Sequence, residues 1–392
     1  MSFDLRRVGV AFAGAAAFVN LYAPQAILPF MAQEFGARAA DASLILTAGS
    51  LAVAFTAPFT GVAADVLGRK WVIAGAILLL IVPTVMAALA PSLHALIFWR
   101  FVQGLLLPPI FAVTIAYVGD EWPAREATGV IGLYASASGF GGFLGRFLPG
   151  VLSDQIGWRG GFLVVAGLTF VCFGVVATML PREKKFVRAS NLTASLMQML
   201  RHLRNPRLIS IFAVGFGVLF NFMAVFTYVS FHLAGPPFNR SAAFLGSIFL
   251  VYLGGTLLTP WTGFAVARLG RRNFVLCVLA VWIFGLLVML IPSIPVIIFG
   301  LVICATCGFL AQASSTSYVA ISAQGGTSSA VGLYVMFFYI GGSFGAYLPG
   351  LAYEAAGWPS TIAFVIAMIA IMGAVVARTW EGKPATIGRA SS

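Results

Sequence analysis

Twelve long apolar stretches restrict this chain more than any other feature of its sequence. A helix needs about 20 mostly apolar residues to cross a hydrocarbon core of about 30 Å. The composition agrees with membrane crossing, because 60% of the 392 residues are hydrophobic and only 9% are charged. We therefore predict an all-α integral membrane protein with twelve spans, at 8–33, 43–64, 71–90, 93–118, 128–153, 158–180, 207–233, 241–266, 273–292, 294–319, 328–353 and 358–379.

The positive charges predict the orientation of these spans. If both termini are cytoplasmic, eighteen of the 23 Lys and Arg residues fall in inner segments, and only Arg38, Arg159 and Arg240 fall in outer loops. This asymmetry follows the positive-inside rule. It also accounts for the net charge of +12 without a nucleic-acid partner. We expect a multi-pass protein of the cell membrane, in the lipid bilayer of a bacterial inner membrane.

The sequence contains an internal duplication. Residues 141–159, GGFLGRFLPGVLSDQIGWR, return at 341–359 as GGSFGAYLPGLAYEAAGWP, and 57–70 returns at 259–272. Two six-helix repeats are typical of transporters whose site lies between the halves. We predict a bundle over 1–180, a basic cytoplasmic linker over 181–206, a second bundle over 207–379 and a cytoplasmic tail over 380–392, in a monomeric protein.

Two motifs carry a resemblance to a known family. GVAADVLGRK at 61–70 resembles the loop signature between helices 2 and 3 of the major facilitator superfamily, and RFVQG at 100–104 resembles a helix 4 motif of its proton-coupled efflux branch. The whole chain is similar to the drug and arabinose-type efflux permeases. The resemblance implies the twelve-helix fold, alternating access to a central cavity and drug:proton antiport.

The first motif also predicts a cytoplasmic gate on physical grounds. Gly61 and Gly68 permit a tight turn, and Asp65 can accept hydrogen bonds from a neighbouring helix N-terminus. Arg69 and Lys70 would anchor the inner surface. The alternative is a solvated turn whose cations reach the headgroups.

Two arginines, Arg100 and Arg146, fall inside spans at a similar predicted depth. The residue that matches Arg146 in the second repeat is Ala346. A charge at this depth costs about 2.5–3.5 kcal/mol on insertion scales, which makes it a candidate functional residue. Gln103 shares the helix face of Arg100. We expect the two arginines to line one positive site, although each side chain can also extend toward the headgroups.

All eleven acidic residues lie in predicted loops or at helix ends, so a cationic substrate would find no buried counter-charge. We therefore expect an anionic, zwitterionic or polyhydroxylated small molecule. Glu34 and Asp154 are the candidate proton sites. The candidate polar groups of the cavity, which interhelical packing explains equally well, are Asn20, Tyr22, Gln25, Asn221, Tyr228 and Gln312.

Secondary transport of a small organic solute, as proton-coupled efflux, explains these features best. The alternatives are uptake or facilitated transport of an organic anion or sugar-like solute, and a non-transporting membrane sensor. An enzyme is not expected, because the three histidines are scattered and form no catalytic constellation. We predict neither a cofactor nor a metal, and the four cysteines fall within spans, where packing explains them.

Overall fold

The computed structural model describes residues 4–60, 68–183, 192–323 and 327–381, and the described regular structure is helical. Its elements are α1 (Leu5–Tyr22), α2 (Leu28–Glu34), α3 (Ala39–Thr56), η1 (Ala57–Phe59), α5 (Arg69–Ala88), α6 (Leu93–Glu121), α7 (Ala124–Met179), α8 (Leu192–His202), α9 (Pro206–Ala234), α10 (Ala242–Ile248), η2 (Phe249–Val251), α11 (Tyr252–Leu258), η3 (Thr259–Trp261), α12 (Thr262–Leu269), α13 (Arg271–Val288), α14 (Ile294–Ser322) and α15 (Thr327–Thr379).

Nine described helical segments are long and apolar enough to cross a membrane. Two of them, α7 and α15, continue through a break in helical geometry at Gly157 and Gly357, where φ is positive. Both segments of each helix exceed the about 20 residues that one crossing needs. The repeated Gly-Trp pairs of the sequence therefore mark reversals of the chain.

Two of the predicted spans are interrupted. The span predicted over 8–33 divides into α1 and α2, with a turn between them that contains Pro24, a residue without a backbone donor. The span predicted over 241–266 divides into α10, α11 and α12, joined by the short 3₁₀ segments η2 and η3. Apolar composition predicted both spans but not these breaks, because a turn buried among other helices keeps the same composition.

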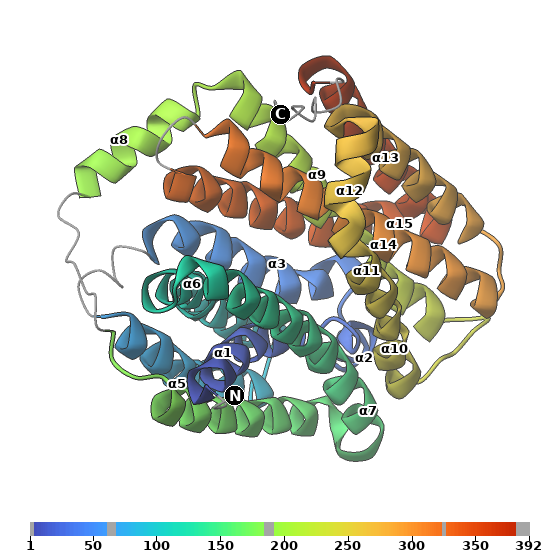
Figure 1. Ribbon diagram of the computed structural model, residues 1–392. Coiled ribbons are helices and arrows are strands. Elements are labelled where there is room, and N and C mark those ends of the chain that lie inside the picture. The colour runs from blue at the N-terminus through green and yellow to red at the C-terminus, as the bar shows by residue number, and fades with distance from the viewer. Residues whose placement is uncertain (1–3, 61–67, 184–191, 324–326, 382–392) are drawn as a thin grey trace.

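The helices form two groups that follow the duplication (Figure 1). The blue-to-green helices α1 to α7 lie together, and α9 to α15 form the second group. The groups meet along two edges, where α3 packs against α15 and α7 packs against α10. We call the end of the bundle that carries the start of α1, α8 and the start of α13 the basic end, and the opposite end the far end.

Glycines allow the matched helices of each half to approach closely. A Cβ atom at Gly145 of α7 would lie 2.3 Å from the carbonyl oxygen of Val19 in α1. A Cβ atom at Gly345 of α15 would lie 2.2 Å from the carbonyl oxygen of Phe220 in α9. Small residues at helix crossings permit this backbone contact in membranes. The repeated glycines therefore specify the same packing twice.

Candidate functional site

Arg146 lies at the junction of the two halves, on the part of α7 that precedes its break. Its side chain is buried, with 3% of the residue exposed. Nε donates a hydrogen bond to Oε1 of Gln25 at 2.7 Å, and Nη1 donates to the carbonyl oxygen of Gly142 at 2.6 Å. Gln25 belongs to the turn between α1 and α2, so the break in the first span supplies the partner of this arginine.

Aromatic rings surround the Arg146 guanidinium. Its central carbon lies 3.8 Å from the ring centroid of Tyr22 and 4.9 Å from the centroids of Phe249 and Tyr252. Cation–π contacts of this kind are stronger where water is excluded. No ion pair involves Arg146 within the described residues. The positive charge is therefore held by rings from both halves and by neutral oxygens of the first half.

Gln25 extends this site to α9. Its Nε2 donates to Oγ1 of Thr227 at 3.3 Å and lies 3.8 Å from Sδ of Met223. Thr227 is fully buried. The sequence analysis selected Tyr22, Gln25 and Arg146 but missed Thr227. It also missed the two rings from η2 and α11, Phe249 and Tyr252, because aromatic residues are common in apolar spans and nothing distinguishes these two in the sequence.

Arg100 occupies a different environment from Arg146. It is 1% exposed, and its donors are directed at the end of α1. Nη2 donates to the carbonyl oxygen of Leu21 at 2.6 Å, and Nη1 donates to that of Asn20 at 2.9 Å. The last carbonyl groups of a helix have no partner inside that helix. Arg100 therefore stabilises the break between α1 and α2 from within the first half, and the two arginines have separate sets of partners.

Asn20, Gln103 and Arg100 belong to one closed network. Nη1 of Arg100 donates to Oε1 of Gln103 at 2.6 Å, and Nε2 of Gln103 lies 2.7 Å from Oγ1 of Thr84. Thr84 in turn donates to Oδ1 of Asn20 at 2.8 Å. All four residues are buried. A fully bonded polar network of this kind rigidifies a core, so these side chains hold α1, α5 and α6 together.

Within the part of the chain that the structure describes, no hydrogen bond joins the candidates of the second half to one another. Nδ2 of Asn221 contacts Sδ of Met372 at 3.3 Å, while its Oδ1 has no hydrogen-bond partner among the described residues. Tyr228 donates to the carbonyl oxygen of Ala346 at 2.5 Å, and Gln312 is half-buried on α14. Ala346 is fully buried beneath this contact. A side chain the size of arginine at this position would therefore have to displace buried neighbours.

At the basic end of the first half, an ion pair joins two helices of the predicted gate region. Gly61 and Asp65 of the predicted gate lie outside the described residues. Gly68 has a φ of +87° and precedes α5. Nη1 of Arg69 lies 2.5 Å from Oδ2 of Asp120 at the end of α6. This ion pair connects the start of α5 to α6.

Glu183 caps the same helix start, which the sequence analysis missed. The backbone N–H groups of Arg69 and Lys70 donate to its carboxylate at 2.8 and 3.3 Å. A carboxylate at a helix N-terminus satisfies free donors and complements the helix dipole. The sequence offered no direct signal, because 114 positions separate Glu183 from Arg69.

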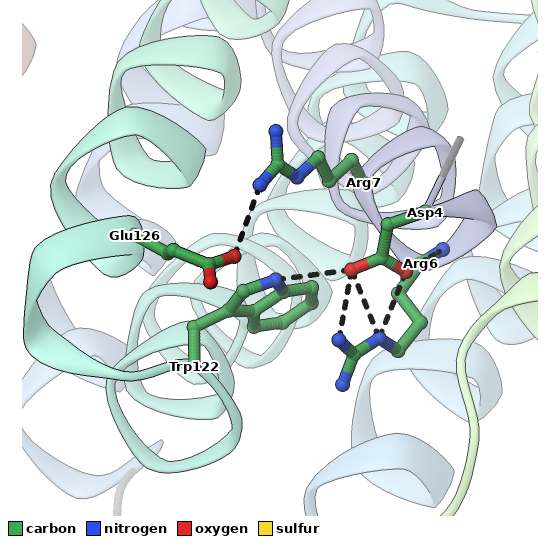
Figure 2. A network of polar contacts seen from close by, with 5 residues as sticks. All are labelled: Asp4, Arg6, Arg7, Trp122 and Glu126. Carbon is green, nitrogen blue, oxygen red and sulfur yellow. Dashed lines mark hydrogen bonds and ion pairs between the residues drawn. The ribbon is translucent and has the colours of Figure 1, made fainter. Parts of the chain in front are cut away.

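A second polar cluster ties the start of α1 to the junction of α6 and α7 (Figure 2). Asp4 pairs with Arg6 at 2.8 Å and accepts a hydrogen bond from Nε1 of Trp122 at 3.2 Å. Arg7 pairs with Glu126 at 3.1 Å. The hydrogen bond from Arg6 lowers the pKa of the Asp4 carboxyl below its usual value. These contacts fix the first helix to its neighbours at the basic end.

At the far end, two acids from matched positions cross the junction of the halves. Oδ2 of Asp154 accepts a hydrogen bond from the backbone N–H of Ala243 at 3.1 Å. Oε1 of Glu354 accepts one from the backbone N–H of Ala40 at 2.9 Å. Each acid belongs to one half and binds the start of a helix in the other half. The far ends are therefore joined along both edges.

Glu34, the other candidate proton site, has its partners within the first half. It accepts hydrogen bonds from Trp158 and Arg159. Burial acts to raise the pKa of this carboxyl, but the hydrogen bonds and the charge of Arg159 outweigh it and lower the pKa below its usual value. Glu34 therefore favours the ionised form.

Comparisons with known proteins give one consistent family. A family model described as Major Facilitator Superfamily matches residues 10–251 and 236–391. The inner membrane transport protein YnfM of Escherichia coli (strain K12) is 32% identical over 365 residues, covering 92% of this chain and 86% of YnfM.

Two solved structures share the fold. The nucleoside transporter NupG (D323A mutant) superposes with a TM-score of 0.80 at 15% identity, covering 96% of this chain and 100% of that one. A bacterial homologue of the human lysosomal transporter Spinster, in an inward-facing and occupied conformation, superposes with a TM-score of 0.79 at 15% identity, covering 97% of this chain and 98% of that one.

Proposed function

Because the chain belongs to the major facilitator superfamily, whose members are membrane transporters of small solutes, we propose that it transports a small organic anion that binds at Arg146. The observation that carries this proposal is a buried guanidinium at the junction of the halves that has no carboxylate partner among the described residues. Rings and neutral oxygens reduce the cost of its burial, and a substrate carboxylate or phosphate would supply the missing counter-charge.

The position of Arg146 suits alternating access. Its partners are Gln25 of the first half and, through Gln25, Thr227 of the second. A group that contacts both halves senses any change in their separation. An anion bound there would bias the two arrangements by its different affinity for each, as any ligand-driven conformational change requires.

We propose that this conformation is open at the basic end and that the basic end faces the cytoplasm. Contacts across both edges at the far end support closure there. Along the part of α7 nearest the basic end, positions Gly129, Gly132 and Gly139 have no atom within 4 Å of where a Cβ would lie, so the opening lies along the α7 edge. On the other edge, a Cβ at Gly332 of α15 would lie 3.9 Å from Pro58 of η1. We further propose that the chain crosses the membrane twelve times, with both termini in the cytoplasm. The two moving bundles are residues 1–180 and 207–379, and the protein is a monomer in a bacterial inner membrane.

For direction, we propose proton-coupled efflux, as the resemblance to the drug and arabinose-type efflux branch implies. Asp154 is better placed than Glu34 to couple protons, because its hydrogen bond to Ala243 crosses between the halves. Protonation would weaken a hydrogen bond to a charged acceptor and so favour opening of the far end.

The test is transport by the full-length protein in sealed proteoliposomes with an imposed pH gradient. The panel comprises monocarboxylates, dicarboxylates, phosphate esters, neutral sugars and tetraethylammonium, loaded on either side. We expect saturable transport of an anion, with poor transport of tetraethylammonium. Accumulation of substrate inside the liposomes driven by an outward proton gradient would identify antiport, whereas accumulation driven by an inward proton gradient would identify symport.

Arg146→Ala should abolish measurable transport and substrate binding while the protein remains monodisperse. Arg146→Lys should retain part of the activity, because the charge survives but the planar fork does not. Arg240→Ala, which removes a positive charge from an exposed far-end residue, is the matched control and should transport normally. Unchanged binding in Arg146→Ala would refute the proposal.

A further inference from the structure

The two halves differ at the start of their matched helices at the basic end. Arg69 is the first residue of α5, and Arg271 is the first residue of α13. Arg69 pairs with Asp120, the next-to-last residue of α6. The next-to-last residue of α14, where the second half would need its acid, is Ile321, which is 72% exposed. The second half therefore keeps the cation but lacks the matching acid.

Arg271 is bound to neutral groups instead. Its Nη1 donates to the carbonyl oxygen of Ser314 and, at 2.7 Å, to Oγ of Ser317. Its guanidinium lies 4.8 Å from the ring centroid of Tyr318. Within the described residues, the hydrogen bonds of Arg271 use Nη1 alone. Nη2 and Nε therefore have no acceptor among the described residues and are the donors that we assign to a ligand.

A pocket of about 520 Å³ adjoins this arginine between α12, α13, α14 and the end of the described chain. Its lining includes Thr262, Ala267, Arg271, Ser317, Tyr318 and Glu381. Ala267 stands where the repeated sequence of the first half has Asp65. Ile321, which also lines the pocket, stands where the first half has Asp120. The pocket therefore lacks the counterparts of both acids, Asp65 and Asp120.

Several buried polar atoms at this end of the second half lack a hydrogen-bond partner among the described residues. They are the hydroxyl of Tyr318, which lines the pocket, and Nε1 of Trp380 and Nε of Arg272, which lie outside its lining. Tyr318 and Trp380 are 7% and 3% exposed, and their ring centroids lie 5.0 Å apart. In the first half, Tyr117, four residues before the end of α6 as Tyr318 is in α14, donates to the carbonyl oxygen of Pro181. Unpaired buried donors are costly, and several beside one cation indicate a missing anionic acceptor.

We propose that this pocket binds a phosphate-type oxyanion, with the Arg271 guanidinium as its main contact and the Tyr318 hydroxyl as a further donor. Arginine suits such anions because its planar donors match their oxygens. Glu381, the one acid in the lining, is itself paired with Arg207. The site is independent of Arg146, and the proposal does not rest on the transport proposed above.

Two sources can supply this anion at the basic end. One is the headgroup phosphate of a phospholipid, whose acyl chains could contact the exposed Trp261 and Phe264 beside the pocket. The other is a soluble phosphate compound. Both present the same oxygens to Arg271, so the experiment must separate them.

The experiment measures thermal unfolding of the full-length delipidated protein in two settings. In neutral detergent it is titrated with inorganic phosphate against potassium chloride at equal ionic strength. In nanodiscs, phosphatidylcholine alone is compared with phosphatidylcholine containing phosphatidylglycerol. Stabilisation by inorganic phosphate supports a site for soluble anions, and stabilisation by phosphatidylglycerol alone supports a headgroup site.

Three variants test the residues. Arg271→Gln should weaken the apparent affinity about tenfold or more, the loss expected when a charge-assisted contact is removed. Ile321→Asp should remove the response, because it places a carboxylate beside Arg271 as Asp120 lies beside Arg69. Tyr318→Phe should weaken affinity a few-fold. Arg268→Gln removes the same charge from a residue outside the pocket lining and is the matched control.

Two results would overturn the proposal. One is the absence of any anion-dependent shift in both settings. The other is an equal response of Arg271→Gln and Arg268→Gln, which would reduce the effect to net charge. Because Ile321 is exposed, the Ile321→Asp variant should fold and so keeps the test decisive if Arg271→Gln does not.

Discussion

The far end and the basic end of the molecule use the internal repeat in opposite ways. At the far end, Asp154 and Glu354 occupy matched positions, and each binds a backbone N–H group of the other half. At the basic end, Arg69 has an acid partner, whereas Arg271 binds serine oxygens beside a pocket. The two repeats therefore share the contacts that join the halves at the far end. They differ in the polar groups at the basic end, where the second half has a pocket.

At the centre of the molecule, as at the basic end, matched positions of the two halves carry different polar groups. Arg146 reaches aromatic rings of the second half, while Ala346 is buried under Tyr228. Both helices nevertheless use the same glycines to approach α1 and α9. The two halves therefore share their packing but differ in their polar groups, and both sites that we propose for ligands lie where they differ.

The largest expected effect comes from forcing the halves to match. Ala346→Arg should prevent folding, because overpacking a core costs about 1–3 kcal/mol and an unpaired buried charge adds several more. The measurement is the yield of monodisperse protein on size exclusion, with Arg146→Ala as the reverse substitution that should remain monodisperse. A well-folded Ala346→Arg protein would show that the two positions are equivalent.

Weakening both far-end contacts should come next in size. Asp154→Asn and Glu354→Gln each remove a charged acceptor from a solvent-accessible contact, worth about 0.5–1 kcal/mol. Each should shift the population toward a far-end-open state about two- to fivefold, and the double variant should combine both shifts. Distances between spin labels at the far ends of α7 and α10 measure this.

Glu34→Gln serves as the control for that experiment, because the partners of Glu34 lie within the first half. Equal shifts in the control and in the two test variants would mean that the far-end acids do not hold the halves together.

A smaller effect is expected at the basic end of the first half. Asp120→Asn leaves Arg69 without its ion pair, and the side chains are 18% and 38% exposed, so the loss should be about 1 kcal/mol or less. Thermal unfolding measures it. Ile321→Asn makes the matched change where the second half has no ion pair and should be neutral. Equal destabilisation by both variants would contradict the asymmetry.

The smallest expected effect concerns pH. The folded-state pKa of Glu34 is lowered, so its contribution to stability is present above its ordinary pKa and is lost as the pH falls through the folded value. With Glu34 and Arg159 42% and 38% exposed, the contribution should be below about 1 kcal/mol. Glu34→Gln should therefore lower Tm slightly at neutral pH, and this effect should disappear once the pH falls below the folded-state pKa of Glu34.

The second half lacks this acid contact, because Trp358 donates to the carbonyl oxygen of Met289. Replacing Trp358 with Phe should therefore remove no carboxylate contact, and any change of its effect with pH should follow His232, whose ring stacks on Trp358 at 5.2 Å between centroids. Loss of that effect in a Trp358→Phe variant that also carries His232→Gln would confirm the histidine as its source, and a dependence that persists there would contradict the comparison.

The sequence alone determined the membrane character, the duplication and the family resemblance. Apolar length and charge asymmetry act locally along the chain, so they can be read without coordinates. The glycines of the repeat can also be seen in the sequence, and a missing side chain permits close packing where two helices cross. The same local logic identified Arg100 and Arg146 as buried cations.

Only the tertiary structure decided what those cations contact. Arg100 binds carbonyl groups at a helix break that composition does not reveal, and Arg146 meets rings from η2 and α11, more than 100 positions away. Glu183 and the pocket beside Arg271 depend in the same way on segments far apart in the chain. A side chain's polarity is set by its own atoms, but its partners are set by which helices lie beside it, and that depends on the packing of the whole bundle.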